Sequence, residues 1–346
     1  MRKMQDFVVR DKAVFIGLED AKKTWKLCVR SEGMVVHELS LPAEYENLRT
    51  YLRRRYPGCA IKLMYEAGFG GFWMYDRLTA DGIACVVTPP NKVTQEKVNK
   101  VKTDRIDARR LARNLEMDDY TSCHVPDPER REDRQISRSA DQFQQMIVAT
   151  KNRIRRFLDC HGLNGSLPAG PWKSSRYRQV WKLPLSGPLQ VSLHALLRSL
   201  AELETARAGL IAELYKLAAK ERYRDAVRLK QSCPGVGKLS AIRFTLEWGK
   251  LSRFPDGKRM ASFTGLTSRE YSTGETIHRG RVTGQSNGVV RGWLIQCAWR
   301  AIRSDPVLRD KFQRVWKNSG SKKKAIVAVA RKLAVRMRAE ISGPQG

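Results

Sequence analysis

Four acidic residues of the sequence have the types and spacing of a metal-ion site. Glu19 and Glu66 each end a mostly apolar run, and Asp104 and Asp107 lie three residues apart on one side of a helical pattern. Four carboxylates brought together repel one another unless cations neutralise them, and hard oxygen ligands select Mg²⁺ or Mn²⁺. Such ions activate a nucleophile and stabilise a leaving oxygen at phosphorus. Because the chain has 35 acidic residues, a chance set of solvated carboxylates is the alternative interpretation.

The elements that must position these acids are predicted from hydrophobic runs. Strands are expected over 13–19, 24–30, 33–40, 60–66 and 83–88, and helices over 43–56, opened by Pro42, and over 72–81. Short links make the first three strands an antiparallel meander, and the alternation that follows predicts a mixed sheet with helices on its faces, the order of a ribonuclease-H-like domain. A helix over 92–115, bent near 102–103 and capped by Thr103, would carry both aspartates to the edge where the first and fourth strands end.

The rest of the chain is predicted to be mainly helical. A long polar helix is expected over 130–162, a loop rich in proline and glycine over 163–188, and a second long helix over 189–230. Leucines at spacings of three, four and seven in the second helix indicate a helical hairpin or coiled coil, either a spacer or dimerisation arm or a helix packed on its own domain. Further helices are expected over 289–303 and 321–341.

Three segments carry a resemblance to a known family. The runs IGLEDAKKTWKL, MYEAGFGGF and VKTDRIDARRLA resemble, in this order and spacing, the DEDD-type insertion-sequence transposases, also called bridge-RNA-guided recombinases. The resemblance extends from about residue 13 to 340. It implies a RuvC-like N-terminal domain at 1–128, a helical, coiled-coil linker with a basic loop at 129–230, and a C-terminal transposase domain with a catalytic serine at 231–346.

The first family motif departs from its usual form. The family's first aspartate falls at Glu19, within a frame that Gly17, Leu18 and Lys22 keep. Asp20 follows directly, but successive strand residues point to opposite faces of a sheet. We therefore assign the first acidic position to Glu19, with Asp20 as the alternative.

The family also uses a serine in its C-terminal domain, which implies a nucleophile in the segment 261–294. Ser272, Thr273 and Gly274 fill the corresponding place, and Ser272 is the first candidate, ahead of Thr273, Ser268 and Ser286. A serine hydroxyl can attack phosphorus and hold a covalent link, which divides strand exchange into two transfers. A turn serine that hydrogen-bonds its own backbone is the structural alternative.

Basic residues suited to phosphate contacts occur in several segments. CPGVGKLSA, at 233–241, resembles the hairpin of a helix-hairpin-helix element, whose glycine amides meet a DNA phosphate. Basic side chains also surround the aspartates, crowd the end of the first long helix and mix with tryptophans in the central loop. The candidate nucleic-acid contacts are Arg105, Arg109, Arg153, Arg155, Arg156, Lys173, Arg176, Arg178, Gly235, Gly237, Lys238, Arg279, Arg281 and Arg291.

The composition agrees with a nucleic-acid partner. Lysine and arginine number 65 against 35 acidic residues, a formal net charge of +30 that indicates a polyanion. Hydrophobic residues make up 42%, enough for a folded core. The sequence contains no run of about 18 apolar residues, so no membrane-spanning helix is expected. The seven cysteines are odd in number and form no CxxC, which favours buried, reduced thiols in a cytosolic protein. With the resemblance to insertion-sequence transposases, we expect a cytoplasmic, nucleoid-associated protein of a prokaryote.

Together these observations predict a site-specific DNA recombinase of an insertion sequence. The resemblance implies donor and target double-stranded DNA, a structured noncoding guide RNA, Mg²⁺ or Mn²⁺, and a homo-oligomer from dimer to tetramer. One alternative is a RuvC-like or ribonuclease-H-like nuclease that uses water in place of Ser272. The other is a basic RNA- or DNA-binding scaffold without catalysis.

Overall fold

The computed structural model describes residues 10–90, 103–163, 172, 174–273, 276–282 and 286–341. The chain divides into two compact units, Met1–Val125 and Pro126–Gly346. Within the described ranges, no helix is long and apolar enough to cross a membrane. Each unit is described by itself below.

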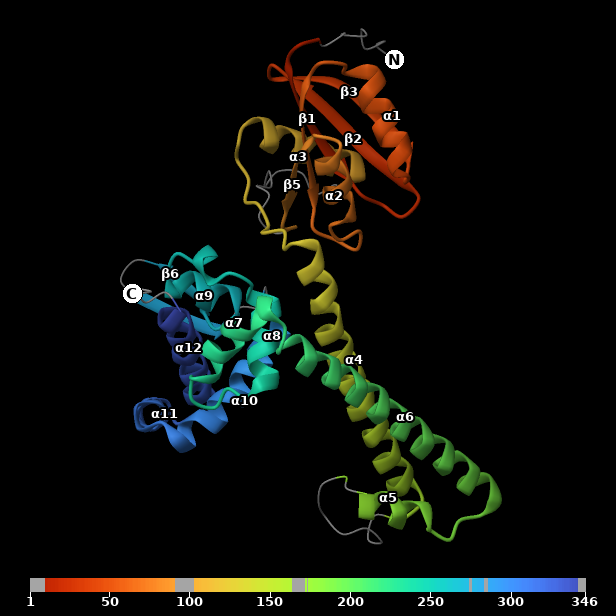
Figure 1. Cartoon of the computed structure of the whole chain (residues 1–346), viewed down its shortest axis with the longest axis vertical. Helices are drawn as coiled ribbons and strands as arrows, with labels where there is room; N and C mark the ends of the chain where they lie inside the picture. The colour runs from red at the N-terminus through yellow and green to blue at the C-terminus, as the bar shows by residue number, and fades with distance from the viewer. Residues whose placement is uncertain are drawn as a thin grey trace. The chain divides into compact units, whose positions relative to one another are not determined.

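A five-stranded mixed sheet forms the centre of the first unit (Figure 1). Its spatial order is β3-β2-β1-β4-β5, with β1 Ala13–Glu19, β2 Thr24–Ser31, β3 Met34–Pro42, β4 Ala60–Glu66 and β5 Ala84–Thr88. Strands β1, β2 and β3 pair antiparallel, whereas β4 pairs parallel with both β1 and β5. The predicted meander and mixed sheet are therefore confirmed, and the fold agrees with that of a RuvC-like domain.

The two faces of this sheet carry different helices. Even-numbered residues of β1, such as Ile16 and Leu18, pack in one cluster with α1, Tyr45–Arg55, and α2, Trp73–Ala80. The opposite face packs against α3, Asp104–Glu116. One cluster joins Met64 of the sheet to Leu111 of α3, and a second joins Cys28 to Ala108 and Ala112. By the period-two alternation of strands, Glu19 and Glu66 belong to the α3 face.

Gly17 sets how closely α3 approaches β1. A Cβ atom built on Gly17 would lie 2.1 Å from the Ala108 carbonyl oxygen and 2.3 Å from the Ala112 amide nitrogen. These are backbone atoms, so only glycine fits at this position, and the small Ala108 and Ala112 complete the contact. Thr103 caps α3 as predicted, because its side chain accepts a hydrogen bond from the Ile106 amide.

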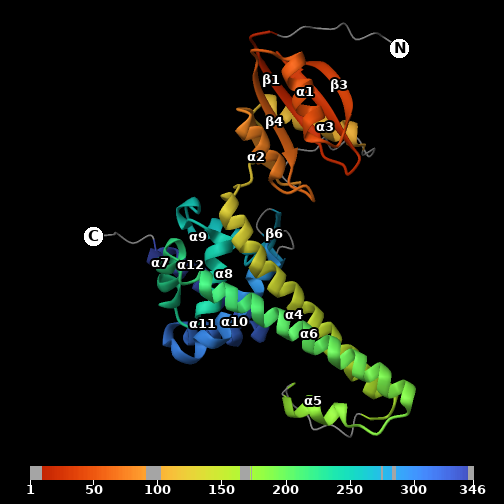
Figure 2. The same cartoon turned by 45° about the vertical axis from the view of Figure 1, so that its right-hand side comes forward.

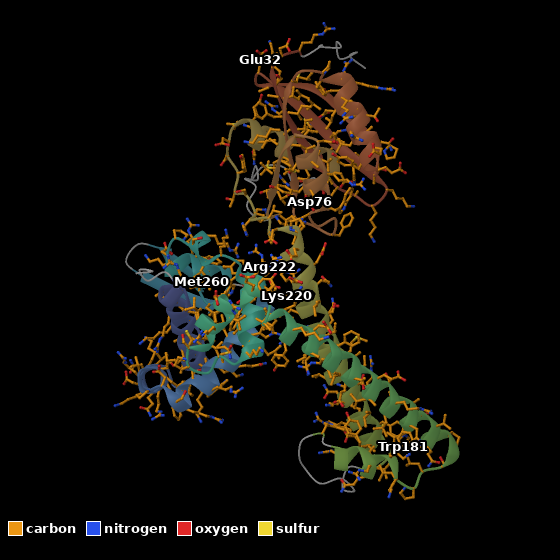
Figure 3. The ribbon with its side chains drawn as sticks, viewed as in Figure 1. Glu32, Asp76, Trp181, Lys220, Arg222 and Met260 are labelled. Atoms are coloured by element: carbon orange, nitrogen blue, oxygen red, sulfur yellow. The ribbon has the colours of Figure 1, made fainter. Side chains whose placement is uncertain are left out.

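The second unit combines a helical arm with a mainly helical body. The arm consists of α4 Pro128–Cys160, α5 Ser174–Trp181 and α6 Gly187–Leu217, and α4 and α6 run side by side in both views (Figures 1 and 2). Trp181 lies near the end of the arm that is farther from the body (Figure 3). The body contains α7 Glu221–Gln231, α8 Lys238–Trp248, α9 Gly257–Phe263, the β6–β7 hairpin Ser268–Thr273 and Thr276–Val282, α10 Gly288–Ser304, α11 Pro306–Ser319 and α12 Lys322–Ile341.

Several predicted boundaries are wrong for physical reasons. Pro42 does not open a helix but ends β3, an edge strand, where a missing amide proton interrupts no ladder. The helix expected over 189–230 is two helices, because a turn at 218–220 lets Tyr223 and Val227 enter the same core as Leu214. The loop expected over 163–188 contains α5, and the hairpin β6–β7 was not predicted as strands.

We predict that Gly17→Ala destabilises the protein by about 1–3 kcal/mol, because the new methyl group must push α3 away from β1. Thermal unfolding followed by circular dichroism would measure the effect. Gly209→Ala is the matched control, since Gly209 is exposed in α6 with no atom near its Cβ position. That control should unfold at or above the wild-type temperature. A wild-type unfolding temperature for Gly17→Ala would contradict the packing argument.

Candidate active site

The four predicted acids come together at one edge of the first unit. Glu19 and Glu66 are the last residues of β1 and β4, which pair parallel up to Leu18 and Tyr65. Asp104 and Asp107 lie in the first turn of α3, where the positive end of the helix dipole favours carboxylates. We refer to Glu19, Glu66, Asp104 and Asp107 as the acid cluster.

The ionisation of Glu19 is perturbed by this arrangement. Burial raises its pKa from 4.5 to about 7, and the negative charges of Glu66, Asp107, Asp20 and Asp104 raise it in the same direction. Every member of the acid cluster therefore lies within electrostatic reach of Glu19. A buried carboxylate that is held among other carboxylates is a frequent feature of functional sites.

Asp20 occupies a different environment from Glu19. Its carboxylate lies against the glycine-rich turn after β4, where a Cβ on Gly70 would lie 2.6 Å from Asp20 Oδ2. Burial is the main cause that raises the Asp20 pKa to about 6, and Glu66 adds to it. Asp104 and Asp107 are not among the causes of the Asp20 shift, whereas both act on Glu19. The charges of the α3 aspartates therefore act on Glu19, which lies on the α3 face of the sheet.

Arg110 is one of the basic residues that the sequence places around the aspartates, and it supplies positive charge inside the acid cluster through ion pairs that were not predicted. One of its Nη atoms lies 3.2 Å from Glu66 Oε1 and 2.7 Å from Asp107 Oδ1. Arg110 follows Asp107 by three residues, so the helical i,i+3 spacing was a signal for this pair. Its guanidinium contacts two of the four carboxylates and offsets one unit of their negative charge.

The acid cluster offers hard oxygen donors for a divalent cation. Glu19 Oε2 is buried and has no hydrogen-bond partner within the described residues, and the same holds for Asp20 Oδ2. In the described parts of the chain, however, no three His, Cys, Asp or Glu side chains already form a group that could hold a metal ion. Carboxylate oxygens are nevertheless the kind of donor that Mg²⁺ or Mn²⁺ prefers, and Arg110 already contacts two of these carboxylates.

The predicted serine lies on the β6–β7 hairpin of the second unit. Ser272 pairs with Ile277 and Thr273 pairs with Thr276, next to Gly274, which is outside the described residues. For residues 268–273, 276–279 and 281, the structure describes the backbone alone. Arg279 pairs with Glu270 in the ladder, and Arg281 follows in β7.

Asn287 fixes the point at which the segment 261–294, which contains the candidate serines, enters α10. Its side chain caps α10 by accepting from the Val290 amide at 3.2 Å, and it donates to Glu247 of α8 at 3.1 Å. Arg138 of α4 donates to the same carboxylate at 3.0 Å. Arg291 donates to the Gly265 carbonyl oxygen at 3.3 Å, so it supports the start of the segment.

The glycine-containing turn between α7 and α8 lies in the segment 233–241 and joins these two helices, as a helix-hairpin-helix requires. Gly235 has φ +77°, and its Cβ would lie 2.3 Å from the Cys297 carbonyl oxygen, so this glycine is needed for packing against α10. Gly237 is exposed at the N-terminus of α8, with open space at its Cβ position. Lys238 is exposed beside it and lies over the Tyr215 ring.

The remaining predicted basic contacts differ in their partners and in their exposure. Arg109 forms a forked ion pair with Glu38 on β3, so it holds α3 to the sheet. Arg176 lies over the Trp172 ring, at 5.3 Å from its centroid. Lys173 lies outside the described residues. Arg105, Arg109, Arg153, Arg155, Arg156 and Arg178 are exposed.

Comparison with known proteins gives matches over both units. A transposase model of the DEDD IS110 type matches residues 16–162, and a model of the transposase IS116/IS110/IS902 family matches residues 227–313. A putative transposase of Sinorhizobium fredii is 29% identical, covering 93% of this chain and 90% of the relative. A second putative transposase of that organism is 26% identical over 94% of this chain and 81% of its own length.

A third relative comes from another organism. The transposase for insertion sequence element IS1533 of Leptospira borgpetersenii is 22% identical over 74% of this chain and 75% of its own length. The two family matches fall on the units that carry the acid cluster and the serine hairpin. The chain is therefore similar over both units to IS110-type insertion-sequence transposases, and these matches support an enzyme of DNA transposition.

Proposed function

We propose that this transposase cuts and rejoins donor and target DNA through a covalent phosphoserine link at Ser272, assisted by the acid cluster. The observation that carries the proposal is the raised pKa of Glu19 among three other carboxylates on the α3 face of the sheet. A fold does not gather such charges for stability, because each ionised neighbour opposes the next. A catalytic use for these carboxylates explains why they are kept together.

The acid cluster would hold Mg²⁺ or Mn²⁺ through the carboxylate oxygens of Glu19, Glu66, Asp104 and Asp107. Bound there, the cation would neutralise charge that develops on the transferring phosphate. Arg110 would have to give up at least part of its contact with Glu66 and Asp107. The exposure of Asp104, in contrast with the buried Asp107, leaves one carboxylate accessible from solvent.

The proposed covalent step is a phosphoryl transfer from DNA to Ser272. Ser272 Oγ forms a bond to phosphorus, and the bond from phosphorus to one deoxyribose oxygen breaks. The serine proton would pass to a general base, and the leaving oxygen would take up a proton. Attack by the hydroxyl of another strand reverses the step and releases Ser272. Arg279 and Arg281 would hold the non-bridging oxygens.

We predict that Ser272→Ala still binds nucleic acid but forms no covalent adduct with DNA, because alanine removes only the nucleophile. Thr273→Ala is the matched control and should retain most of the recombination. Denaturing gels with end-labelled DNA would detect the adduct, and mass spectrometry would identify the modified residue. Efficient recombination by Ser272→Ala, without an adduct in 261–288, would reject serine chemistry and favour the nuclease alternative.

The acid cluster should be required in the same assay. Asp104→Ala, or wild-type protein in EDTA, should form no adduct while DNA binding stays largely unchanged, since positive surface charge supplies most of the affinity. Added Mg²⁺ or Mn²⁺ should restore the wild-type protein and leave Asp104→Ala inactive. An adduct formed at the wild-type rate by Asp104→Ala would separate the acid cluster from the reaction.

We further propose that a structured noncoding RNA guides the choice of DNA sites by base pairing. The exposed arginines of α4 and α5, in a chain of net charge +30, support an RNA partner. Synapsis of two DNA molecules needs at least two copies of the chain, so the active assembly would be a dimer to tetramer.

The RNA proposal predicts specific retention of the RNA encoded beside the gene. Filter binding should give nanomolar-scale affinity that falls steeply with salt, because bound counterions are released. An unrelated RNA of equal length is the control. Equal affinity for the two RNAs across the salt series would contradict guidance, and light scattering of the RNA–DNA complex would measure the number of copies.

A further inference from the structure

An aromatic ladder lies on the outer surface of the body, where α10, α11 and the start of α12 meet. Its rings belong to Trp299 on α10 and to Phe312 and Trp316 on α11. The centroids of Trp299 and Phe312 are 5.5 Å apart, and those of Phe312 and Trp316 are 5.9 Å apart. Lys322, at the start of α12, places its ammonium group 4.6 Å from the Trp316 centroid.

The two indoles are not needed to fill the core. Phe312 is 8% exposed and belongs to the buried cluster of the body, together with Leu308 of the same helix. Trp299 and Trp316 are 41% and 40% exposed. On α10 the buried positions are taken by other residues, among them Leu294, Cys297 and Ala298. Large flat rings therefore remain available at the surface.

The surroundings of the ladder are strongly basic. Residues 299–324 contain nine lysines and arginines against two acidic residues, Asp305 and Asp310. Asp305 caps α11 and pairs with Arg336 at 2.7 Å, and Asp310 pairs with Arg314 at 2.7 Å. Both carboxylates are thus engaged within the fold. The consecutive Lys322, Lys323 and Lys324 are exposed in the first turn of α12.

We infer that this ladder is a binding site for single-stranded nucleic acid, with unpaired bases stacked on Trp299 and Trp316 and the lysines of α11 and α12 along the phosphates. Exposed aromatic rings in a positive field are the combination used for unpaired strands. A duplex keeps its base faces covered by stacking and would leave the indoles unused. A protein partner fits less well, because lysine is depleted in protein interfaces. This inference uses neither Ser272 nor the acid cluster.

Photocrosslinking of the full-length protein tests the site directly. The probe is a 12-nucleotide strand with one 5-iodouracil, prepared as RNA, as DNA and as a duplex with its complement. Irradiation should join the single strand to Trp299 or Trp316, identified by peptide mass spectrometry, and should give little product with the duplex. Whichever of RNA and DNA crosslinks more strongly identifies the source of the unpaired strand.

Substitution gives a second, quantitative measurement. The double variant Trp299→Ala/Trp316→Ala should bind the single strand about tenfold more weakly than wild type, because stacked rings are lost. Trp316→Phe should retain most of the affinity, since it keeps a flat ring. Trp181→Ala is the matched control: Trp181 is 42% exposed, but it lies on the arm and stacks on His194.

Two results would overturn the inference. One is an unchanged affinity of the double variant, together with crosslinks that map elsewhere on the wild-type protein. The other is loss of self-association in the double variant, measured by light scattering, with no change in affinity for the strand. That second result would assign the ladder to a protein interface.

Discussion

The close packing of α3 against β1 at Gly17 determines where the acidic residues lie. Because the helix backbone rests directly on this glycine, the first turn of α3 reaches the edge where β1 and β4 end. Parallel pairing of those strands brings Glu19 and Glu66 to the same edge and face. Each carboxylate is thus positioned by backbone geometry, which can hold like charges together against their repulsion.

The electrostatic cost of this arrangement is only partly offset. Arg110 contacts Glu66 and Asp107, and the helix dipole favours the two α3 aspartates. Glu19 keeps a buried oxygen without a hydrogen-bond partner in the described structure, and its pKa is raised to about 7. A site that leaves this charge unbalanced is one where a cation or substrate is expected to bind. Stability is reduced at the position that the proposed function uses.

Much of the first unit was predictable because its signals are local. The bounds predicted for β1 and β4 agree with the structure, since continuous apolar runs end at acidic residues, and the Thr103 cap was visible in sequence. The break between α6 and α7 was not predictable, because no proline or glycine marks 218–220 and the turn depends on burial of Tyr223. The Arg110–Glu66 contact and the Trp299–Trp316 ladder depend on side-chain contacts between different elements, which residue patterns describe poorly.

The acid cluster is held together against the repulsion of its charges. The most direct test compares the pH dependence of the unfolding temperature of Glu19→Gln with that of wild type, without metal. The pKa of Glu19 in the folded protein lies above its ordinary value. The contribution of Glu19 to the wild-type free energy of unfolding is therefore fully present below pH 4.5 and is lost as the pH rises through about 7. The unfolding temperature of Glu19→Gln should therefore exceed that of wild type by about 2–5 °C at pH 8 and by little at pH 5. Added Mn²⁺ should raise the wild-type value more than that of the variant. An unfolding temperature of Glu19→Gln equal to or below that of wild type at pH 8 in EDTA would contradict the account.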